Sequence, residues 1–253
     1  MPMIHVAYFT DPLCPWSWGA EPQLRRLEVE FSEQVQITYV MVGIARELDG
    51  PEKLASTLDV ISQTGQPADP RIWLEHPPRS SYPSCLAVKA ASEQRLDAAF
   101  LRRLREGAFL RRERIDNAEA FLVAGRDVDG LDLARFDIDM RSNAIVELFG
   151  ADRERAQGAC GDGRPALPAF TVDGGDVIGI DALRDAVIAA GATAATLPTP
   201  LEALARFGTA TTAELAAVAG MPLARTRVEL WRAAGEFAAR PVDFAFGELW
   251  AAA

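Results

Sequence analysis

The chain has few of the residues that build metal centres and disulfide frameworks. Its 253 residues include three cysteines, at positions 14, 85 and 160, and two histidines, His5 and His76. Three widely separated cysteines do not make a disulfide framework. Neither histidine has the spacing of a metal ligand, and the sequence does not favour a histidine-based catalytic triad. We therefore expect no metal ion and no tightly bound cofactor, and we expect the cysteines to be thiols.

Long hydrophobic runs are also missing. No stretch of about 18 apolar residues predicts a membrane span. The start, "MPMIHVAYFTDP", has neither the basic residues nor the apolar run of a signal peptide. The formal net charge of −10 argues against a general affinity for nucleic acid or for anionic membranes. These absences predict a cytoplasmic protein that binds neither nucleic acid nor membranes.

The hydrophobic pattern predicts an α/β fold. Apolar runs at 4–9 and 35–43 indicate strands, and a helix between them starts at Cys14-Pro15 and is kinked by Pro22. Residues 51–159 look helical throughout, and a hairpin at 168–180 and a helix at 181–191 follow. We expect one sheet built from residues 1–50 and 160–191, with 51–159 inserted as an all-helical subdomain.

The last part of the chain predicts a small, mostly helical appendage. Residues 192–200 have the composition of a linker, and 201–253 contain "TTAELAAVAGMPLARTRVELWRAAG", which resembles a helix-turn-helix. Strands at "FGTA" and "PVDFAFGELW" would make it winged-helix-like. Because this part has five Arg against six acidic residues, docking on the body or on a second subunit, as in a homodimer, is favoured over DNA reading.

The stretch "TDPLCPWSWG" is the candidate site. Cys14 is expected at a helix N-terminus, where free backbone N–H groups and the helix dipole favour the thiolate. This placement predicts a lowered pKa for the thiol, with the Ser17 hydroxyl one turn further on as a hydrogen-bond donor to the sulfur. The alternative is a structural turn in which Cys14 caps the helix and Trp16 and Trp18 only pack.

A second segment, "GRPALPAFTV", places Pro168 directly before the returning strand. A proline at such an edge is a candidate for a cis peptide bond. If the sheet assembles as expected, this loop faces the first junction. Asp11 ends the first strand beside Cys14, where we expect it to form a turn rather than to tune the protons of the site.

Together, "DPLCPWSWGAEP", "PALPAFTV" and "GGDVIGIDALRDAV" resemble the thioredoxin superfamily, in particular its DsbA-like branch. That branch includes FrnE-type oxidoreductases, 2-hydroxychromene-2-carboxylate isomerases and kappa-class glutathione transferases. The segments "EHPPRSSYPSCLAVKAASEQ" and "FLRRLREGAFL" are most similar to its cytosolic subgroup, which includes the ClpXP adaptor for Spx. The resemblance covers roughly residues 3–191 and implies a thioredoxin-like fold.

The resemblance also implies roles for individual residues. Cys14 would be the reactive thiol and Pro168 the cis-proline. The backbone of Leu167 would pair with an extended peptide or thiol substrate, and Trp16 would also contact that substrate. Ser17 stands where redox members carry a second, resolving cysteine. A mixed disulfide on Cys14 then needs another thiol for release.

Three functions remain open. The first is a single-thiol oxidoreductase or thiol transferase, with Cys85, Cys160 or a glutathione-like molecule as the second thiol. The second is an isomerase or transferase that uses glutathione or another low-molecular-weight thiol as cosubstrate; the corresponding branches carry serine where this chain has Cys14. The third is a protein-binding adaptor for proteolysis, whose partner is a protein.

Overall fold

A computed structural model describes residues 3–160, 163, 165–242 and 246–253. Its central sheet has the strand order β2-β1-β3, formed by β1 (Ile4–Thr10), β2 (Val35–Met41) and β3 (Ala169–Val172). β2 is parallel to β1, and β3 is antiparallel to it, with Phe9 opposite Ala169. The chain therefore returns to its first strand after more than a hundred residues, as the strand pattern predicts.

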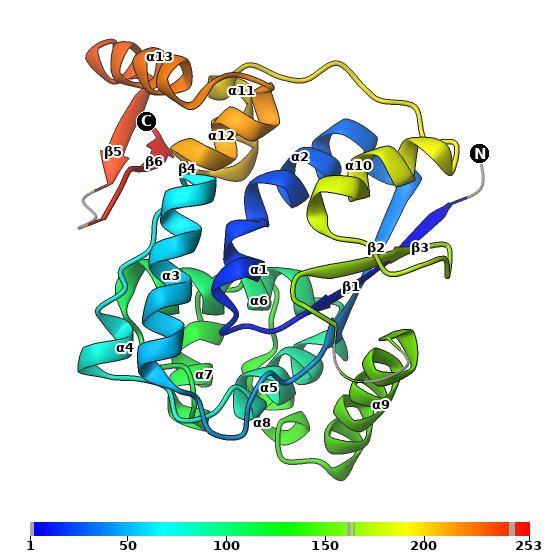
Figure 1. Cartoon of the computed structure of the whole chain (residues 1–253). Coiled ribbons are helices and arrows are strands. Elements are labelled where there is room, and N and C mark those ends of the chain that lie inside the picture. The colour runs from blue at the N-terminus through cyan, green and yellow to red at the C-terminus, as the bar shows by residue number, and fades with distance from the viewer. Residues whose placement is uncertain (1–2, 161–162, 164, 243–245) are drawn as a thin grey trace.

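Helices cover both faces of this sheet, because the side chains of β1 alternate between them. Val6 and Tyr8 pack with α2 (Glu21–Phe31) and α10 (Ile180–Ala189) on one face. Ala7 and Phe9 pack on the other face, against α9 (Asn143–Cys160). Figure 1 shows α2 and α10 above the sheet and α9 below it. β1 is consequently buried between two layers of helices, which hold its C-terminal end at Thr10 in place.

The helix expected to be kinked at Pro22 is broken into two. α1 (Pro15–Gly19) ends where α2 begins, with Ala20 between them. Pro22 occupies the first turn of α2, where its missing N–H costs no hydrogen bond. The break makes α1 a single short turn that carries Cys14 at its start.

The inserted helical region, residues 50–160, builds a core of its own. That core includes Phe100, Leu104 and Phe109 and extends to Leu13, which precedes α1, and to Trp18 within α1. Trp18 Nε1 donates to the carbonyl of Pro67 at 2.8 Å. The helices of the region are α3 (Gly50–Thr64), α4 (Ile72–Glu75), α5 (Tyr82–Ser92), α6 (Asp97–Arg105), the π-helical turn η2 (Glu106–Leu110), α7 (Ala118–Gly125), α8 (Leu133–Asp139) and α9.

The expected hairpin after Pro168 forms only in part. The backbone of Ile178 exchanges two hydrogen bonds of 2.9 Å with Phe170 across a turn at Asp173 and Gly174. The second arm is thus a single bridge rather than a strand. It leads directly into α10.

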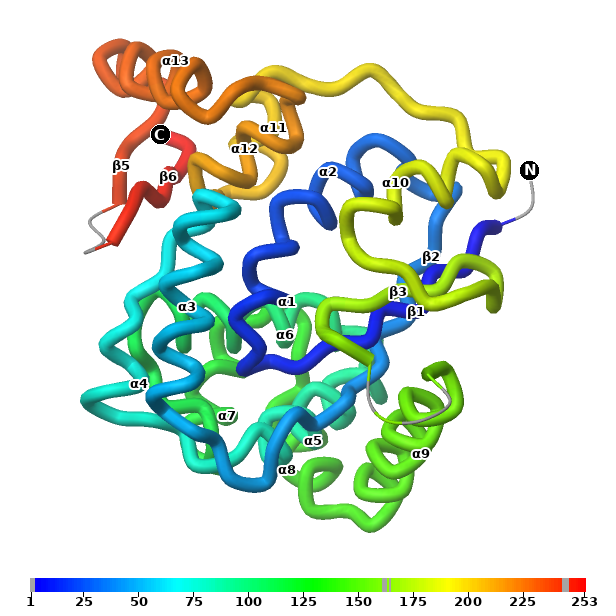
Figure 2. The backbone as a smooth tube through the Cα atoms, viewed as in Figure 1, coloured from blue at the N-terminus to red at the C-terminus, as the bar shows by residue number. Residues whose placement is uncertain are grey.

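Residues 200–252, here called the C-terminal appendage, form three helices and a small sheet. The helices are α11 (Pro200–Phe207), α12 (Thr212–Ala219) and α13 (Leu223–Gly235), and the sheet has the order β4-β6-β5 from β4 (Thr209–Thr211), β5 (Ala239–Val242) and β6 (Leu249–Ala252). The sequence predicts a small, mostly helical appendage, and the described residues of this part, which leave out 243–245, are mostly helical. The linker crosses from α10 to α11, and α12 packs against α2 (Figure 2).

No helix in the described part of the chain is long and apolar enough to cross a membrane.

Candidate thiol site

The loop between β1 and α1 holds Cys14 in place. The Leu13 amide donates to Asp11 Oδ1 at 2.8 Å, and the Cys14 amide donates to the Asp11 carbonyl at 3.2 Å. Cys14 is the extended N-cap residue of α1, and Pro15 follows at the first helical position. Both the turn-forming role of Asp11 and the helix start at Cys14-Pro15 agree with the sequence prediction.

The predicted low pKa of Cys14 is wrong. Cys14 is only 6% exposed, and burial raises the pKa of its thiol above the ordinary value. Asp11, an anion three residues away, acts in the same direction. Because α1 has a single turn, the dipole that favours the thiolate at its N-terminus is small.

Ser17, three residues after Cys14 in the sequence, favours the thiolate form of Cys14. Both its hydroxyl and its amide lower the pKa of Cys14, against the larger effect of burial. The side chain is fully buried, and its Oγ has no hydrogen-bond partner of standard geometry within the described residues. The Ser17 hydroxyl thus acts on Cys14 and on Tyr8 without a hydrogen bond of standard geometry to either.

Asp11 joins the loop to Cys85. The carboxylate is completely buried, and its Oδ2 accepts the Ile44 amide at 2.8 Å and the Cys85 thiol at 3.5 Å. Burial raises the pKa of Asp11, and burial together with Asp11 raises the pKa of Cys85 well above its ordinary value. Cys85, a candidate resolving thiol, thus lies beside the Cys14 loop but is held as a protonated, unreactive thiol.

Cys160, the other candidate resolving thiol, is half-buried at the end of α9. All three cysteines are free thiols. Within the described chain, no hydrogen bond or disulfide joins Cys160 to Cys14. Residues 161–162 and 164, in the glycine-rich stretch that leads from Cys160 to Pro168, lie outside the described residues.

Leu167 and Pro168 lie at the same end of the sheet as Cys14. The bond between them is cis. Because Ala169 pairs with Phe9, the two residues before it lie beside the end of β1, where the Cys14 loop starts. Leu167, Pro168 and Trp16 are all partly exposed, while Cys14 is buried. Among the described residues no group of three or more metal-ligating side chains is present.

The sequence interpretation missed Arg105, which comes from α6 of the inserted helical region and is completely buried. Its Nη2 donates to Tyr8 Oη at 3.3 Å, to the carbonyl of Asp11 at 3.4 Å and to Thr10 Oγ1. Its Nη1 forms an ion pair with Glu21. Nothing in the pattern "FLRRLREGAFL" separates this arginine from its neighbours except its place on the apolar stripe of Leu101, four residues earlier.

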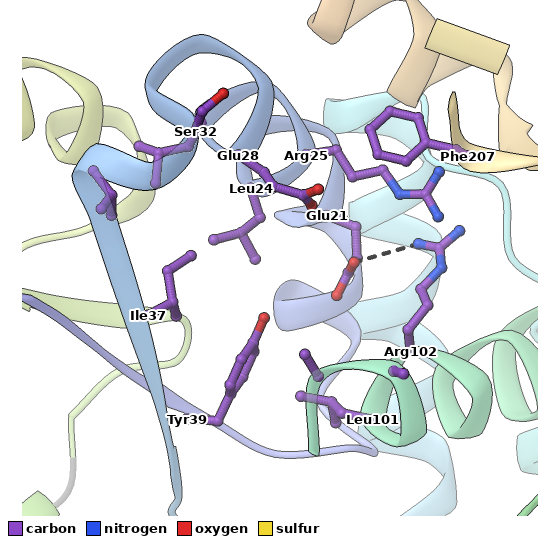
Figure 3. A pocket seen from close by; sticks show the side chains of 14 residues that line it. Glu21, Leu24, Arg25, Glu28, Ser32, Ile37, Tyr39, Leu101, Arg102 and Phe207 are labelled. Carbon is purple, nitrogen blue, oxygen red and sulfur yellow. Dashed lines mark hydrogen bonds and ion pairs between the residues drawn. The ribbon is translucent and has the colours of Figure 1, made fainter. Parts of the chain in front are cut away.

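A cavity of about 420 Å³ lies between α2, β2, α6 and the end of α11. Figure 3 shows its mostly apolar floor, formed by side chains such as Leu24, Ile37 and Leu101, and the Arg102–Glu21 pair at one side. Cys14, Ser17, Leu167 and Pro168 are not among its lining residues. The cavity and the thiol site are thus separate, and Glu21 contacts both the cavity and Arg105.

Comparison with known proteins gives a family and a fold. Residues 8–174 match the sequence profile of the family described as Thioredoxin. A ClpXP adapter protein SpxH from Halalkalibacterium halodurans is 33% identical over 164 residues, which cover 60% of this chain and 53% of the adapter. The chain therefore spans about half the length of the curated relatives that it matches.

Solved structures show the same fold. A putative protein disulfide isomerase from Nitrosomonas europaea matches with a TM-score of 0.64 at 21% identity, over 75% of this chain and 97% of that one. The cytosolic disulfide reductase DsbM from Pseudomonas aeruginosa, determined with GSH, matches with a TM-score of 0.60 at 23% identity, over 73% of this chain and 96% of that one.

Proposed function

Since this chain belongs to the thioredoxin family, we propose that it captures a partner protein through the single thiol of Cys14, as a long-lived mixed disulfide. The fold supports a thiol oxidoreductase-like role, and the adapter relatives support a protein partner. Capture without rapid turnover combines both. It also agrees with the two chemical peculiarities of the site, the serine at position 17 and the buried cysteine.

The step is an ordinary thiol–disulfide exchange. The Cys14 thiolate attacks one sulfur of a disulfide R–S–S–R′, a Cys14–S–S–R bond forms, and R′–S⁻ leaves with the electron pair of the broken bond. Release requires attack by another thiol, which forms a new disulfide with R and returns Cys14 to the thiolate. Glutathione or a similar small thiol is the proposed agent of release.

The observation that carries the proposal is Ser17 beside Cys14. A cysteine at this position would attack the mixed disulfide intramolecularly, whereas the Ser17 hydroxyl cannot. Burial of Cys14 adds to the effect, because a thiol with a raised pKa is a poor leaving group. The mixed disulfide should form slowly and also break slowly. Trp16, Leu167 and Pro168 would contact the captured segment at the rim.

The experiment uses oxidised glutathione as the disulfide and a Cys160→Ser background. We expect mass spectrometry to find glutathione on Cys14 that persists after the free reagent is removed. In Ser17→Cys the adduct should give way to a disulfide between Cys14 and the introduced cysteine, and Cys14→Ser should carry none. An adduct that never forms on Cys14, or one that is lost equally fast with and without the introduced cysteine, would contradict capture.

A second candidate is a purely non-covalent adaptor, favoured by the identity of 33% to an adapter protein. In that case the partner binds the surface around Leu167 and Pro168 or the C-terminal appendage, and Cys14 serves only as a helix cap. A pull-down from the native cytoplasm distinguishes the two. A partner retained by Cys14→Ser supports the non-covalent adaptor, and a partner lost with Cys14 and released by a reducing agent supports capture.

A further inference from the structure

We propose that Arg105 is the positioning residue of the Cys14 loop and that its guanidinium sets the reactivity of the Cys14 thiol. This inference rests on the proposed use of Cys14 as a nucleophile. It assigns a role in the thiol site to the inserted helical region, which supplies Arg105 from the last position of α6.

The contacts of Arg105 end on the backbone that carries Cys14. The carbonyl of Asp11 accepts both the Cys14 amide and Arg105 Nη2, and Thr10 Oγ1 accepts the same nitrogen. Arg105 therefore fixes the last residue of β1 and the first residue of the loop at the same time. A displacement of the guanidinium would shift the residue to which Cys14 is hydrogen-bonded.

A chain of buried charges holds Arg105 in turn. Glu21 binds Arg105 with one carboxylate oxygen and Arg102 with the other, at 3.3 Å for Arg102. Arg102 also pairs with Glu214, which is completely buried and belongs to the C-terminal appendage. Figure 3 shows the Glu21–Arg102 pair between α2 and α6. The ion pairs therefore form a continuous series, Glu214–Arg102–Glu21–Arg105.

The charge of Arg105 acts directly on the thiol. Burial has the largest effect on the pKa of Cys14 and raises it, whereas Ser17 and, to a smaller extent, the guanidinium of Arg105 favour the thiolate and lower it. Burial disfavours the charge of Arg105 itself, but Tyr8 and Glu21 raise the pKa of the guanidinium, so that it stays ionised. A fixed cation in a water-poor site is worth more than the same charge in solvent.

Arg103 provides a matched control on the same helix. It too is buried, but it points to a different set of partners, with Nη1 at 2.6 Å from Glu113 and Nε at 2.8 Å from Asp127. It makes no recorded contact with the Cys14 loop in the described structure. Loss of Arg103 should cost stability as loss of Arg105 does, without acting on the thiol.

The experiment measures the rate of iodoacetamide alkylation of Cys14 against pH, followed by mass spectrometry of the Cys14 peptide in the full chain. In Arg105→Met the apparent pKa should rise by about one unit, and the rate at pH 7 should fall about tenfold. Arg103→Met should keep the wild-type profile. Equal profiles in the two variants, or a wild-type profile in Arg105→Met, would overturn the proposal.

Arg105→Lys covers the case in which the methionine variant does not fold. Lysine keeps the charge but cannot reach Tyr8, Thr10 and Asp11 as a fork, so its profile should lie between those of the wild type and Arg105→Met. It is compared with Arg103→Lys, and identical profiles would count against positioning. Alkylation needs neither a partner protein nor glutathione. The alkylation profiles can therefore contradict the role of Arg105 while the glutathione adduct on Cys14 persists. Conversely, the adduct can be absent while the alkylation profile shifts as expected.

Discussion

Glu214 in the C-terminal appendage binds Arg102 in the inserted helical region through both of its carboxylate oxygens, and it does so without any exposure to solvent. The same carboxylate accepts a hydrogen bond from Gln66 Nε2 at 3.1 Å, and its Oε2 lies 3.5 Å from Arg25 Nη1. Its side chain also caps α12 by accepting the Thr211 amide. The appendage is thus attached to the body by a buried carboxylate, whose negative charge is costly to leave without a positively charged partner.

Glu214→Gln should lower the free energy of unfolding by about 3 kcal/mol, because it leaves Arg102 partly unpaired in a buried position. Glu202→Gln is the control. Both glutamates occupy the third position of a capping box, and glutamine can fill that role, but Glu202 is exposed and pairs with no arginine in the described residues. The control should change stability by less than about 0.5 kcal/mol in urea unfolding. Similar losses in the two variants would show that the cap, not the ion pair, matters.

Stability should also depend on pH through Glu214. Burial alone would raise its pKa, but Arg102 and Arg25 hold it at about 2, below the ordinary 4.5. A carboxyl with a depressed pKa stabilises the folded state above the unfolded value and loses that contribution as the pH falls through the folded value. The difference in unfolding free energy between wild type and Glu214→Gln, ~3 kcal/mol at pH 7, should therefore shrink between pH 5 and pH 2. Chemical denaturation across this range measures it, and a constant difference would refute the assignment.

Alkylation of Cys14 should be slow at neutral pH in the unmodified protein. Burial raises the pKa of this thiol, so the thiolate fraction is small at pH 7 and increases through pH 9. The rate with iodoacetamide, followed at the Cys14 peptide, should rise without a plateau across that range. A plateau below pH 8 would mean that the helix N-terminus, as first expected from the sequence, outweighs burial.

The order of strands and helices could be predicted from the sequence because it depends on local patterns. The apolar runs that became β1 and β2, the helix start at Cys14-Pro15 and the turn at Asp173 and Gly174 each follow from a few neighbouring residues.

The electrostatics of the site could not be predicted in this way. The pKa of Cys14 depends first on burial, and Arg105, 91 positions away in the chain, also acts on it. Arg102, Arg103 and Arg105 stand in one basic run, yet Arg102 pairs with Glu214 and Arg103 with Glu113, while Arg105 shares Glu21 with Arg102 and donates to the Asp11 carbonyl. Only the fold decides which of the three contacts the loop that carries Cys14.

Ser17→Ala should separate stability from reactivity at the site. The Ser17 hydroxyl is buried and unpartnered within the described structure, so its removal relieves a desolvation cost and should raise the free energy of unfolding by up to about 1 kcal/mol. The same change removes a group that favours the Cys14 thiolate, so the pKa of the thiol should rise and alkylation at pH 7 should slow. Ser84→Ala is the control: Ser84 is equally buried, but its hydroxyl donates to the carbonyl of Ile115 at 2.6 Å, and its loss should destabilise the protein by about 1–3 kcal/mol. If Ser17→Ala is as destabilising as Ser84→Ala, the Ser17 hydroxyl has a structural partner and is not held free for the chemistry of Cys14.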